Sequence, residues 1–213
     1  MTPLEQVDFA GLRIRFDERV LRPRPWTAAQ SRWATELLAT APGGAVLELC
    51  TGAGQLGLLA VADTDRRLVA VDADPVAVRF ARDNAAAAGL RTRVEVREGQ
   101  LDRVLAPDEE FAMVLADPPW VRHAAVRRFP EDPVAAIDGG VDGLDLARRC
   151  LAVAERHLSP GGSALLQLGS VEQAARVDRE LRTTGHLTVV EVRDRPGQGV
   201  LVRVDRVSPD PVS

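Results

Sequence analysis

Short apolar runs alternate with longer amphipathic stretches along the chain after residue 42. Runs rich in Val, Leu and Ala predict strands, and apolar residues spaced three and four apart predict helices. The expected strands are 45–50, 68–72, 92–96, 111–116, 163–168, 187–192 and 199–204. The expected helices are 75–88, 143–158 and 171–184. Strands that alternate with helices in this way indicate βαβ units and a parallel sheet.

The connection between the last two expected strands, residues 193–198, has the length of a hairpin loop and contains Pro196 and Gly197. A parallel pair would need a crossover of about a dozen residues or more, so these two strands must run antiparallel. The pattern therefore predicts an α/β fold whose seven-stranded, mostly parallel sheet ends in an antiparallel C-terminal hairpin. Residues 43–206 would form this domain. Residues 1–42 would add an N-terminal segment and a helix that caps the active site, and 207–213 a frayed tail.

Length and composition narrow the class of protein. A chain of 213 residues is about one domain long, and no apolar run approaches the ~18 residues that cross a membrane. The N-terminus lacks the basic and apolar blocks of a signal peptide, so we expect a cytoplasmic protein. Cys50 and Cys150 are the only cysteines, are far apart and have no nearby His pair, which predicts no metal site. A net charge of −4 disfavours non-specific binding of nucleic acid.

A glycine-rich loop follows the first strand of this domain. Residues 52–57 read Gly-Ala-Gly-Gln-Leu-Gly, a GxGxxG sequence between a strand and a helix, and Asp72 ends the next strand. Such glycines let a ligand approach the backbone, and the carboxylate binds ribose hydroxyls. An NAD-dependent oxidoreductase has the same pattern and stays as an alternative.

Other residues of this region favour S-adenosylmethionine (SAM). Glu48, just before the loop, suits a cationic ligand and would be unfavourable beside a pyrophosphate. The alternative role for Glu48 is to brace the loop. Gln100 follows the third strand, where its amide oxygen would accept a bond from the adenine amino group; the alternative is an exposed loop residue. The candidate cofactor-binding residues are Glu48, Thr51, Gly52, Gly54, Asp72, Ala73, Gln100 and Asp117.

The candidate catalytic residues are Asp117, Pro118, Pro119 and Trp120, which directly follow the fourth strand. Ligands of open α/β sheets bind beyond the carboxyl ends of the strands, so this tetrapeptide should face the cofactor. Two prolines fix the backbone and remove two N–H donors. The Asp117 carboxylate and the Pro118 carbonyl would accept the N–H groups of a planar nitrogen, and Trp120 would offer it a flat face. These residues predict methyl transfer to an amide or amino nitrogen.

The chain resembles the HemK/PrmC family of SAM-dependent glutamine-amide methyltransferases over about residues 9–204. The resemblance rests on four stretches: Phe9–Leu12 followed by Val20–Thr27; the glycine loop with Asp72–Pro75 and Ala81–Asn84; Asp117–Trp120; and Ala136–Leu144 leading to Leu158–Gly162. It implies a Rossmann-like methyltransferase fold with SAM as methyl donor. It also implies that residues 23–27 and 138–143 wall the active site, with Arg24 and Thr27 on the substrate side together with Trp26.

Three features differ from the family pattern. Its tetrapeptide is usually Asn-Pro-Pro-Tyr, whereas this chain has Asp117 and Trp120. Asn both donates to and accepts from a glutamine amide, while an ionised Asp only accepts and suits an exocyclic amine. Trp26 stands where the family has Glu. The family's release-factor enzymes carry a helical N-terminal domain, which we do not expect before Phe9; a single-domain branch works with a partner subunit, so a partner is possible here.

A protein glutamine side chain is the leading substrate by this resemblance. An exocyclic amine on nucleic acid and a small metabolite remain as alternatives, the former disfavoured by the acidic net charge and the lack of a target-recognition domain. The loop 121–129 is locally basic and would contact a phosphate, an acidic protein segment or only solvent. We expect a protein or small-molecule substrate, no membrane partner and no metal.

Overall fold

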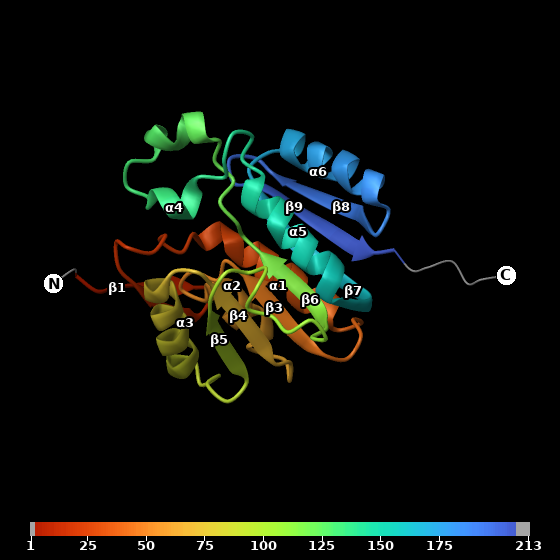
Figure 1. Ribbon diagram of the computed structural model, residues 1–213. Coiled ribbons are helices and arrows are strands. Elements are labelled where there is room, and N and C mark those ends of the chain that lie inside the picture. The colour runs from red at the N-terminus through yellow and green to blue at the C-terminus, as the bar shows by residue number, and fades with distance from the viewer. Residues whose placement is uncertain (1–2, 208–213) are drawn as a thin grey trace.

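Seven strands form the central sheet of the computed structural model, which describes residues 3–207 (Figure 1). They are β3 (Ala45–Leu49), β4 (Leu68–Asp72), β5 (Val94–Glu98), β6 (Phe111–Ala116), β7 (Leu158–Leu168), β8 (Leu187–Arg195) and β9 (Gly199–Arg206), in the order β5-β4-β3-β6-β7-β9-β8. Strands β3 to β7 are parallel, whereas β9 runs antiparallel to both β7 and β8. The predicted parallel sheet with an antiparallel C-terminal hairpin is confirmed.

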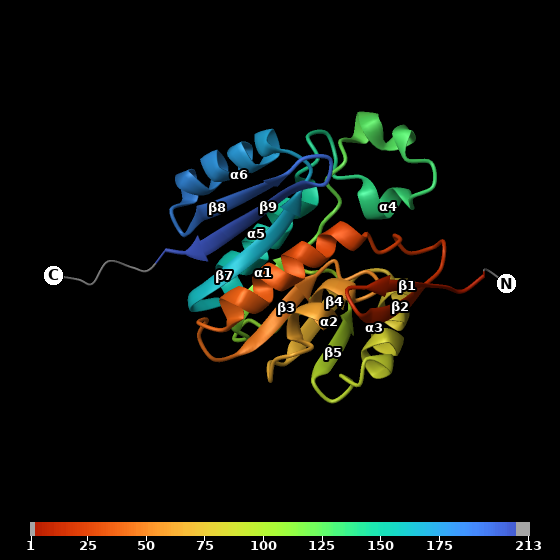
Figure 2. The ribbon, with the colours of Figure 1, turned by 180° about the vertical axis from the view of Figure 1, so that it is seen from behind.

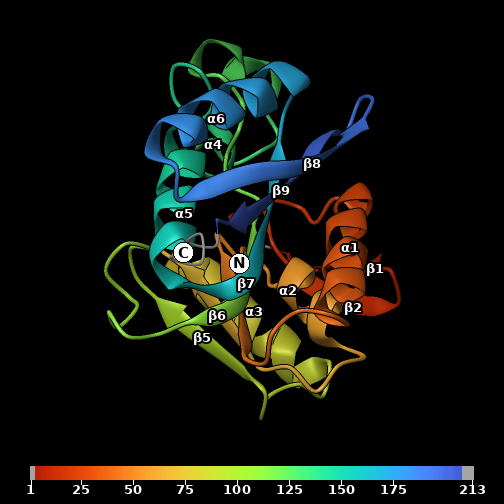
Figure 3. The same ribbon diagram turned by 90° about the vertical axis from the view of Figure 1, so that its right-hand side faces the viewer.

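Helices cover both faces of this sheet, as Figure 3 shows edge-on. Helices α1 (Ala28–Leu38), α2 (Gln55–Val61) and α3 (Pro75–Ala87) pack on one face, and α5 (Asp145–His157) and α6 (Val171–Thr184) on the other. The alternation within β3 shows how each strand serves both layers: Leu47 and Leu49 pack towards α5, while Val46 packs towards α1 and α2. None of the helices in residues 3–207 is long and apolar enough to cross a membrane.

Local sequence signals explain where the helices begin and end. Helix α3 starts at Pro75, and the Asp74 side chain accepts a hydrogen bond from the backbone N–H of Val76 at 2.8 Å. Helix α6 is capped by Ser170 and ends at Gly185, which has a φ of 75°. The predicted helices 75–88 and 171–184 are therefore found at nearly these bounds.

Strand β7 differs from its predicted range of 163–168, because it begins at Leu158 as soon as α5 ends. Leu158 pairs with Phe111 and Ser163 with Met113, so the ladder contains an irregularity between them. The Ser-Pro-Gly-Gly segment that was expected to separate helix and strand is accommodated inside the strand by this shift of register.

An N-terminal hairpin, not anticipated as strands, is formed by β1 (Glu5–Phe9) and β2 (Leu12–Phe16). Ala10 and Gly11 both have positive φ, as a two-residue turn of type I′ requires. Asn84 of α3 exchanges hydrogen bonds with the backbone of Arg15 at 2.9 Å and donates to the Ala53 carbonyl at 2.8 Å. The hairpin is thus joined to the glycine-rich loop; Figure 2 shows it beside α3 and α1.

Residues 1–42 were predicted to hold a helix that caps the active site. That helix, α1, packs on the sheet with buried Trp33, Ala34 and Leu38. A one-turn helix, η1 (Pro25–Thr27), precedes it. The excursion 121–143 is the part of the connection between β6 and α5 that contains η2 (His123–Arg128) and α4 (Val134–Ile137) (Figure 1). Of the tail predicted at 207–213, residues 208–213 lie outside the described residues.

Candidate active site

A cavity of about 300 Å³ lies at the carboxyl ends of β3, β4, β5 and β6. The sheet order brings together the residues that follow these strands although they are far apart in the chain. Of the predicted site residues, the cavity is lined by Gly52, Asp72, Ala73, Gln100, Asp117 and Pro119. Its wall is completed by Arg19–Leu21 of the N-terminal segment and by Pro133, Ala135 and Ala136 at α4.

Asp72 fixes the glycine-rich loop and still faces the cavity. Its Oδ2 accepts a hydrogen bond from the Gly52 N–H at 2.8 Å, and its Oδ1 accepts one from the Asp74 N–H at 3.0 Å. Burial raises the pKa of Asp72, although these backbone donors act in the opposite direction. Each carboxylate oxygen keeps a second lone pair, so Asp72 is placed to accept from ligand hydroxyls as well.

Glu48, Thr51 and Gly54 are buried behind the loop and do not line the cavity. The Thr51 hydroxyl donates to Glu48 Oε2 at 2.5 Å, and the Gly57 N–H also donates to this carboxylate. A Cβ on Gly57 would approach Glu48 Oε2 to 2.5 Å, so the third glycine of the motif makes room for the acid. In this structure Glu48 braces the loop, the alternative that its sequence position allowed; its predicted contact with the cofactor stays a prediction.

The titration of Glu48 gives a testable dependence of stability on pH. Burial raises its pKa to about 7, above the ordinary value of 4.5. The unfolded chain therefore ionises Glu48 at lower pH than the folded protein does, and this acid should reduce the free energy of unfolding as pH rises from about 4.5 to 7. Urea unfolding across this range should show that the free energy of unfolding of Glu48→Gln falls less, or rises more, with pH than that of the unsubstituted protein. The same dependence on pH in both proteins would contradict the assignment.

Gln100 lies at the cavity, but its Oε1 already accepts a hydrogen bond from Arg149 Nη2 at 3.1 Å. Arg149 also contacts Asp102 Oδ1 at 3.0 Å and itself lines the cavity. The predicted bond from an adenine amino group to Gln100 would have to share this oxygen with Arg149.

The tetrapeptide Asp117–Trp120 follows the end of β6; Asp117 and Pro119 line the cavity, whereas Pro118 and Trp120 do not. The Trp120 side chain lies close enough to the Asp117 carboxyl to lower its pKa. Burial raises the pKa of Asp117 to about 7, and the nearby Trp120 side chain opposes this shift. Within residues 3–207 no backbone amide donates to the carbonyl of Pro118, which leaves this oxygen available to a substrate N–H.

The predicted substrate-side residues lie near the cavity without lining it. Arg24 Nη2 contacts both carboxylate oxygens of Asp132, at 2.6 and 2.7 Å, and its guanidinium lies 5.7 Å from the Trp26 ring. Thr27 donates to the Arg24 carbonyl at 2.8 Å and is buried. The ion pair between Arg24 and Asp132 joins the N-terminal segment to residues 121–143, and so connects two segments that line the cavity.

Sequence comparison places this site in a known family. Residues 29–131 match the family model of the methyltransferase small domain. A release factor glutamine methyltransferase of Clostridium acetobutylicum is 30% identical over 210 residues, 95% of this chain and 71% of that protein. One of Deinococcus radiodurans is 37% identical over 207 residues, 94% of this chain and 72% of that protein. The chain belongs to the HemK/PrmC family of glutamine methyltransferases.

The HemK/PrmC family also includes a ribosomal protein uL3 glutamine methyltransferase of Bordetella pertussis, 34% identical over 75% of this chain and 55% of that protein. Among solved structures, the hMettl16 catalytic domain, crystallised with hairpin 6 of the MAT2A 3′UTR, has a TM-score of 0.74. It is 16% identical and covers 95% of this chain and 78% of that chain, which shows the shared fold. The expected Rossmann-like methyltransferase fold is confirmed.

This HemK/PrmC-family chain is therefore a SAM-dependent methyltransferase, as predicted, and the alternative of an NAD-dependent oxidoreductase is excluded. The residues at the cavity fit SAM. Gln55 lines the cavity, and its Oε1 is buried without a hydrogen-bond partner, as an acceptor for a ligand ammonium group would be. Asp72 and Asp117 add carboxylates that favour a cationic ligand. Within residues 3–207 no cluster of His, Cys, Asp and Glu is arranged to hold a metal ion.

Sequence reasoning missed Gln55, Arg149 and the wall formed by α4. Gln55 occupies a variable position inside the GxGxxG pattern, where only the glycines carry a signal. Arg149 reaches the cavity from α5, and α4 reaches it from an excursion that has no strong periodicity. These positions depend on how separate elements pack together.

Proposed function

We propose that this enzyme transfers the methyl group of SAM to the side-chain amide nitrogen of a glutamine in a protein. The observation that supports this most strongly is that Asp117 and Pro119 line the cavity, while within residues 3–207 no backbone amide donates to the carbonyl of Pro118 between them. An amide NH₂ group has two N–H bonds, and the Asp117 carboxyl and the Pro118 carbonyl supply one acceptor for each. The relatives named above act on glutamine in release factors and in ribosomal protein uL3.

The chain's own residues would act mainly by positioning. SAM supplies an electrophilic methyl group on a sulfonium when bound. Asp117 and the Pro118 carbonyl hold both N–H bonds of the amide in one plane, so that the nitrogen lone pair turns towards the methyl group. The S–C bond of a bound SAM would break as the new N–C bond forms, and the surplus proton on the amide nitrogen would pass to solvent. Such positioning of reacting groups is a large part of catalysis in bimolecular transfers.

The raised pKa of Asp117 reconciles this residue with a glutamine substrate. The family's Asn presents both a donor and an acceptor, which pair with the carbonyl and NH₂ of a glutamine amide. With its pKa raised to about 7 by burial, Asp117 retains a proton on a large share of molecules near neutral pH. A protonated carboxyl also presents one donor and one acceptor, and thus imitates Asn.

An exocyclic amine on a nucleobase is the second candidate. It is favoured by Asp117 in its ionised form, which only accepts, and by the basic η2 segment with Arg127 and Arg128. The acidic net charge of −4 disfavours it, because binding of nucleic acid depends on neutralising phosphates. A partner subunit remains a proposal as well, to be tested by whether the purified chain is active alone.

Labelled methyl transfer from SAM onto cell lysate, separated into protein, nucleic acid and small-molecule fractions, tests the substrate class. Label in the protein fraction that is lost with Asp117→Ala supports the proposal. Label that follows the nucleic acid fraction, or that persists in the variant, would contradict it.

A further inference from the structure

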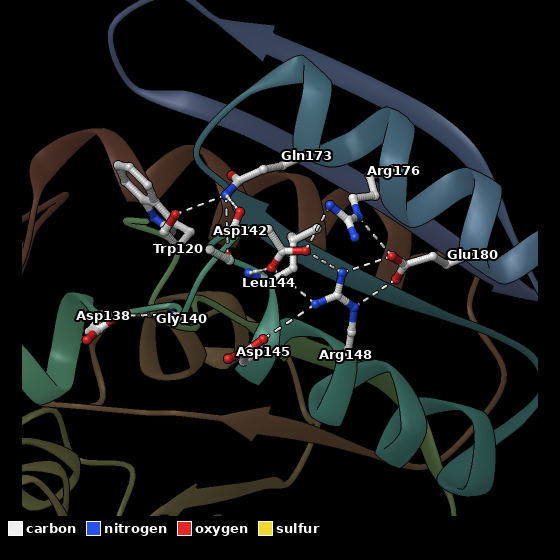
Figure 4. A network of polar contacts seen from close by, with 11 residues as sticks. Trp120, Asp138, Gly140, Asp142, Leu144, Asp145, Arg148, Gln173, Arg176 and Glu180 are labelled. Atoms are coloured by element: carbon white, nitrogen blue, oxygen red, sulfur yellow. Dashed lines mark hydrogen bonds and ion pairs between the residues drawn. The ribbon is translucent and has the colours of Figure 1, made fainter. Parts of the chain in front are cut away.

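Gln173, near the start of α6, joins the tetrapeptide Asp117–Trp120 to two neighbouring segments (Figure 4). Its Nε2 group donates to the carbonyl oxygens of Trp120 at 3.0 Å, Asp142 at 3.0 Å and Gly143 at 3.4 Å. Its Oε1 accepts from the Gly169 N–H at 2.8 Å. Gln173 is 5% exposed, so these bonds are shielded from water. One amide group thus connects the end of β6, the loop before α5 and the end of β7.

We propose that Gln173 is a positioning residue for methyl transfer, which fixes Trp120 so that its indole keeps the Asp117 carboxyl aimed at the substrate nitrogen. This inference rests on the proposed role of Asp117 in binding the target amide. Gln173 does not line the cavity and is separated from Asp117 by Trp120, so it acts through its neighbour. Its bond to the Trp120 carbonyl fixes the backbone of the last residue of the tetrapeptide, and the Trp120 side chain lies close enough to Asp117 to influence its carboxyl.

Two glycines allow Gln173 and Trp120 to come this close. A Cβ on Gly143 would lie 2.3 Å from Gln173 Nε2 and 2.4 Å from the Trp120 carbonyl oxygen. A Cβ on Gly169 would lie 2.4 Å from Trp120 Cε3 and 2.9 Å from Gln173 Oε1. Neither position has space for a side chain, and Gly143 also has a φ of 79°. The backbone on both sides of Trp120 is therefore shaped to fit this amide and this indole.

An ionic cluster secures the loop that Gln173 binds. Asp142 contacts Arg148 of α5 at 2.6 Å and Arg176 of α6 at 3.2 Å, and both arginines contact Glu180 (Figure 4). The hydrogen bond from Arg148 lowers the pKa of Asp142 to about 2, so the cluster stays charged across the physiological range. Because α5 and α6 are tied to the loop in this way, the carbonyls of Asp142 and Gly143 are held for Gln173.

The test compares Gln173→Ala and the near-isosteric Gln173→Met with a matched control, Gln167→Ala. Gln167 is also a buried amide near the end of β7, but its Nε2 bonds to the carbonyls of Leu168 and Gln198, away from Trp120. A purely structural role predicts similar losses for all three variants. A positioning role predicts that kcat for methyl transfer falls by about tenfold to a hundredfold only in the Gln173 variants, with Kd for S-adenosylhomocysteine within about twofold.

A second readout needs no substrate. With 5-fluorotryptophan incorporated, the ¹⁹F resonance of Trp120 is assigned by its loss in Trp120→Phe, and its titration near pH 7 is assigned to Asp117 by its loss in Asp117→Asn. Gln173→Met should move this resonance and shift its titration to higher pH, because a displaced indole no longer stabilises the carboxylate. An unmoved resonance and an unchanged kcat would overturn the inference. A moved resonance with no transfer to glutamine would instead refute the proposed substrate and leave the positioning role standing.

Discussion

Replacing Asp117 with alanine is expected to lower kcat for methyl transfer about a hundredfold while S-adenosylhomocysteine still binds. Asp117 supplies one of the two acceptors for the N–H bonds of the target nitrogen. A buried N–H that loses its acceptor costs about 1–3 kcal/mol, and each 1.36 kcal/mol corresponds to about a tenfold change in rate. Single-turnover transfer and calorimetric binding of S-adenosylhomocysteine, measured on the same preparation, check this result.

Asp117→Asn is the matched control, since it restores the residue that the family usually has at this position. Asn donates and accepts as the protonated Asp117 does, so the variant should keep about a tenth or more of the activity on a glutamine substrate. Its kcat should also lose the pH dependence centred near 7. A collapse of Asp117→Asn to the level of Asp117→Ala would point to a substrate that needs the carboxylate, such as an exocyclic amine.

Replacing Asp72 with alanine is expected to raise the Kd for S-adenosylhomocysteine by about a hundredfold or more. The substitution removes the acceptor for the ribose hydroxyls, worth about 1.5–3 kcal/mol for each bond to a charged group. It also leaves the N–H groups of Gly52 and Asp74 without their present partner, which loosens the loop. Isothermal titration calorimetry measures the effect, and kcat at saturating SAM should change much less than the Kd.

Asp72→Asn separates these two contributions. The Asn amide keeps one oxygen for the Gly52 N–H or for a hydroxyl. The Kd of Asp72→Asn for S-adenosylhomocysteine should therefore lie between those of the unsubstituted protein and of Asp72→Ala. Binding of S-adenosylhomocysteine by Asp72→Ala at the original affinity would show that the cofactor lies elsewhere.

The parts of the fold that depend on local patterns could be predicted from the sequence. The helices 75–88 and 171–184 were predicted at nearly their observed bounds, because capping residues such as Asp74 and Gly185 act on their own backbone neighbours. The β1–β2 hairpin carried a comparable signal in its alternating Val7, Phe9, Leu12 and Ile14 around Gly11, but the turn was not interpreted as such. The start of β7 depended on a register shift against β6, which no local pattern reports.

The site was predictable where residues follow strands, because parallel strands bring their carboxyl ends to one edge of the sheet. Asp72, Gln100 and Asp117 were found in this way, and all three line the cavity. Gln173 could not be predicted in this way, because it lies 53 positions from Trp120 in the chain. Its partners are backbone carbonyls, which the sequence does not reveal. Glu48 shows a further limit: its position was informative, but whether it faces the ligand or braces the loop depended on the side of β3 from which it projects.

The identity of the methylated group tests the central proposal most directly. Protein labelled by this enzyme with SAM carrying a ¹⁴C-methyl group can be hydrolysed in acid, which cleaves amide bonds. A methylated glutamine amide should release its label as volatile methylamine and leave unlabelled glutamate. Label that stays on a lysine, an arginine or another acid-stable residue, or that is never found in protein, would contradict methylation of glutamine.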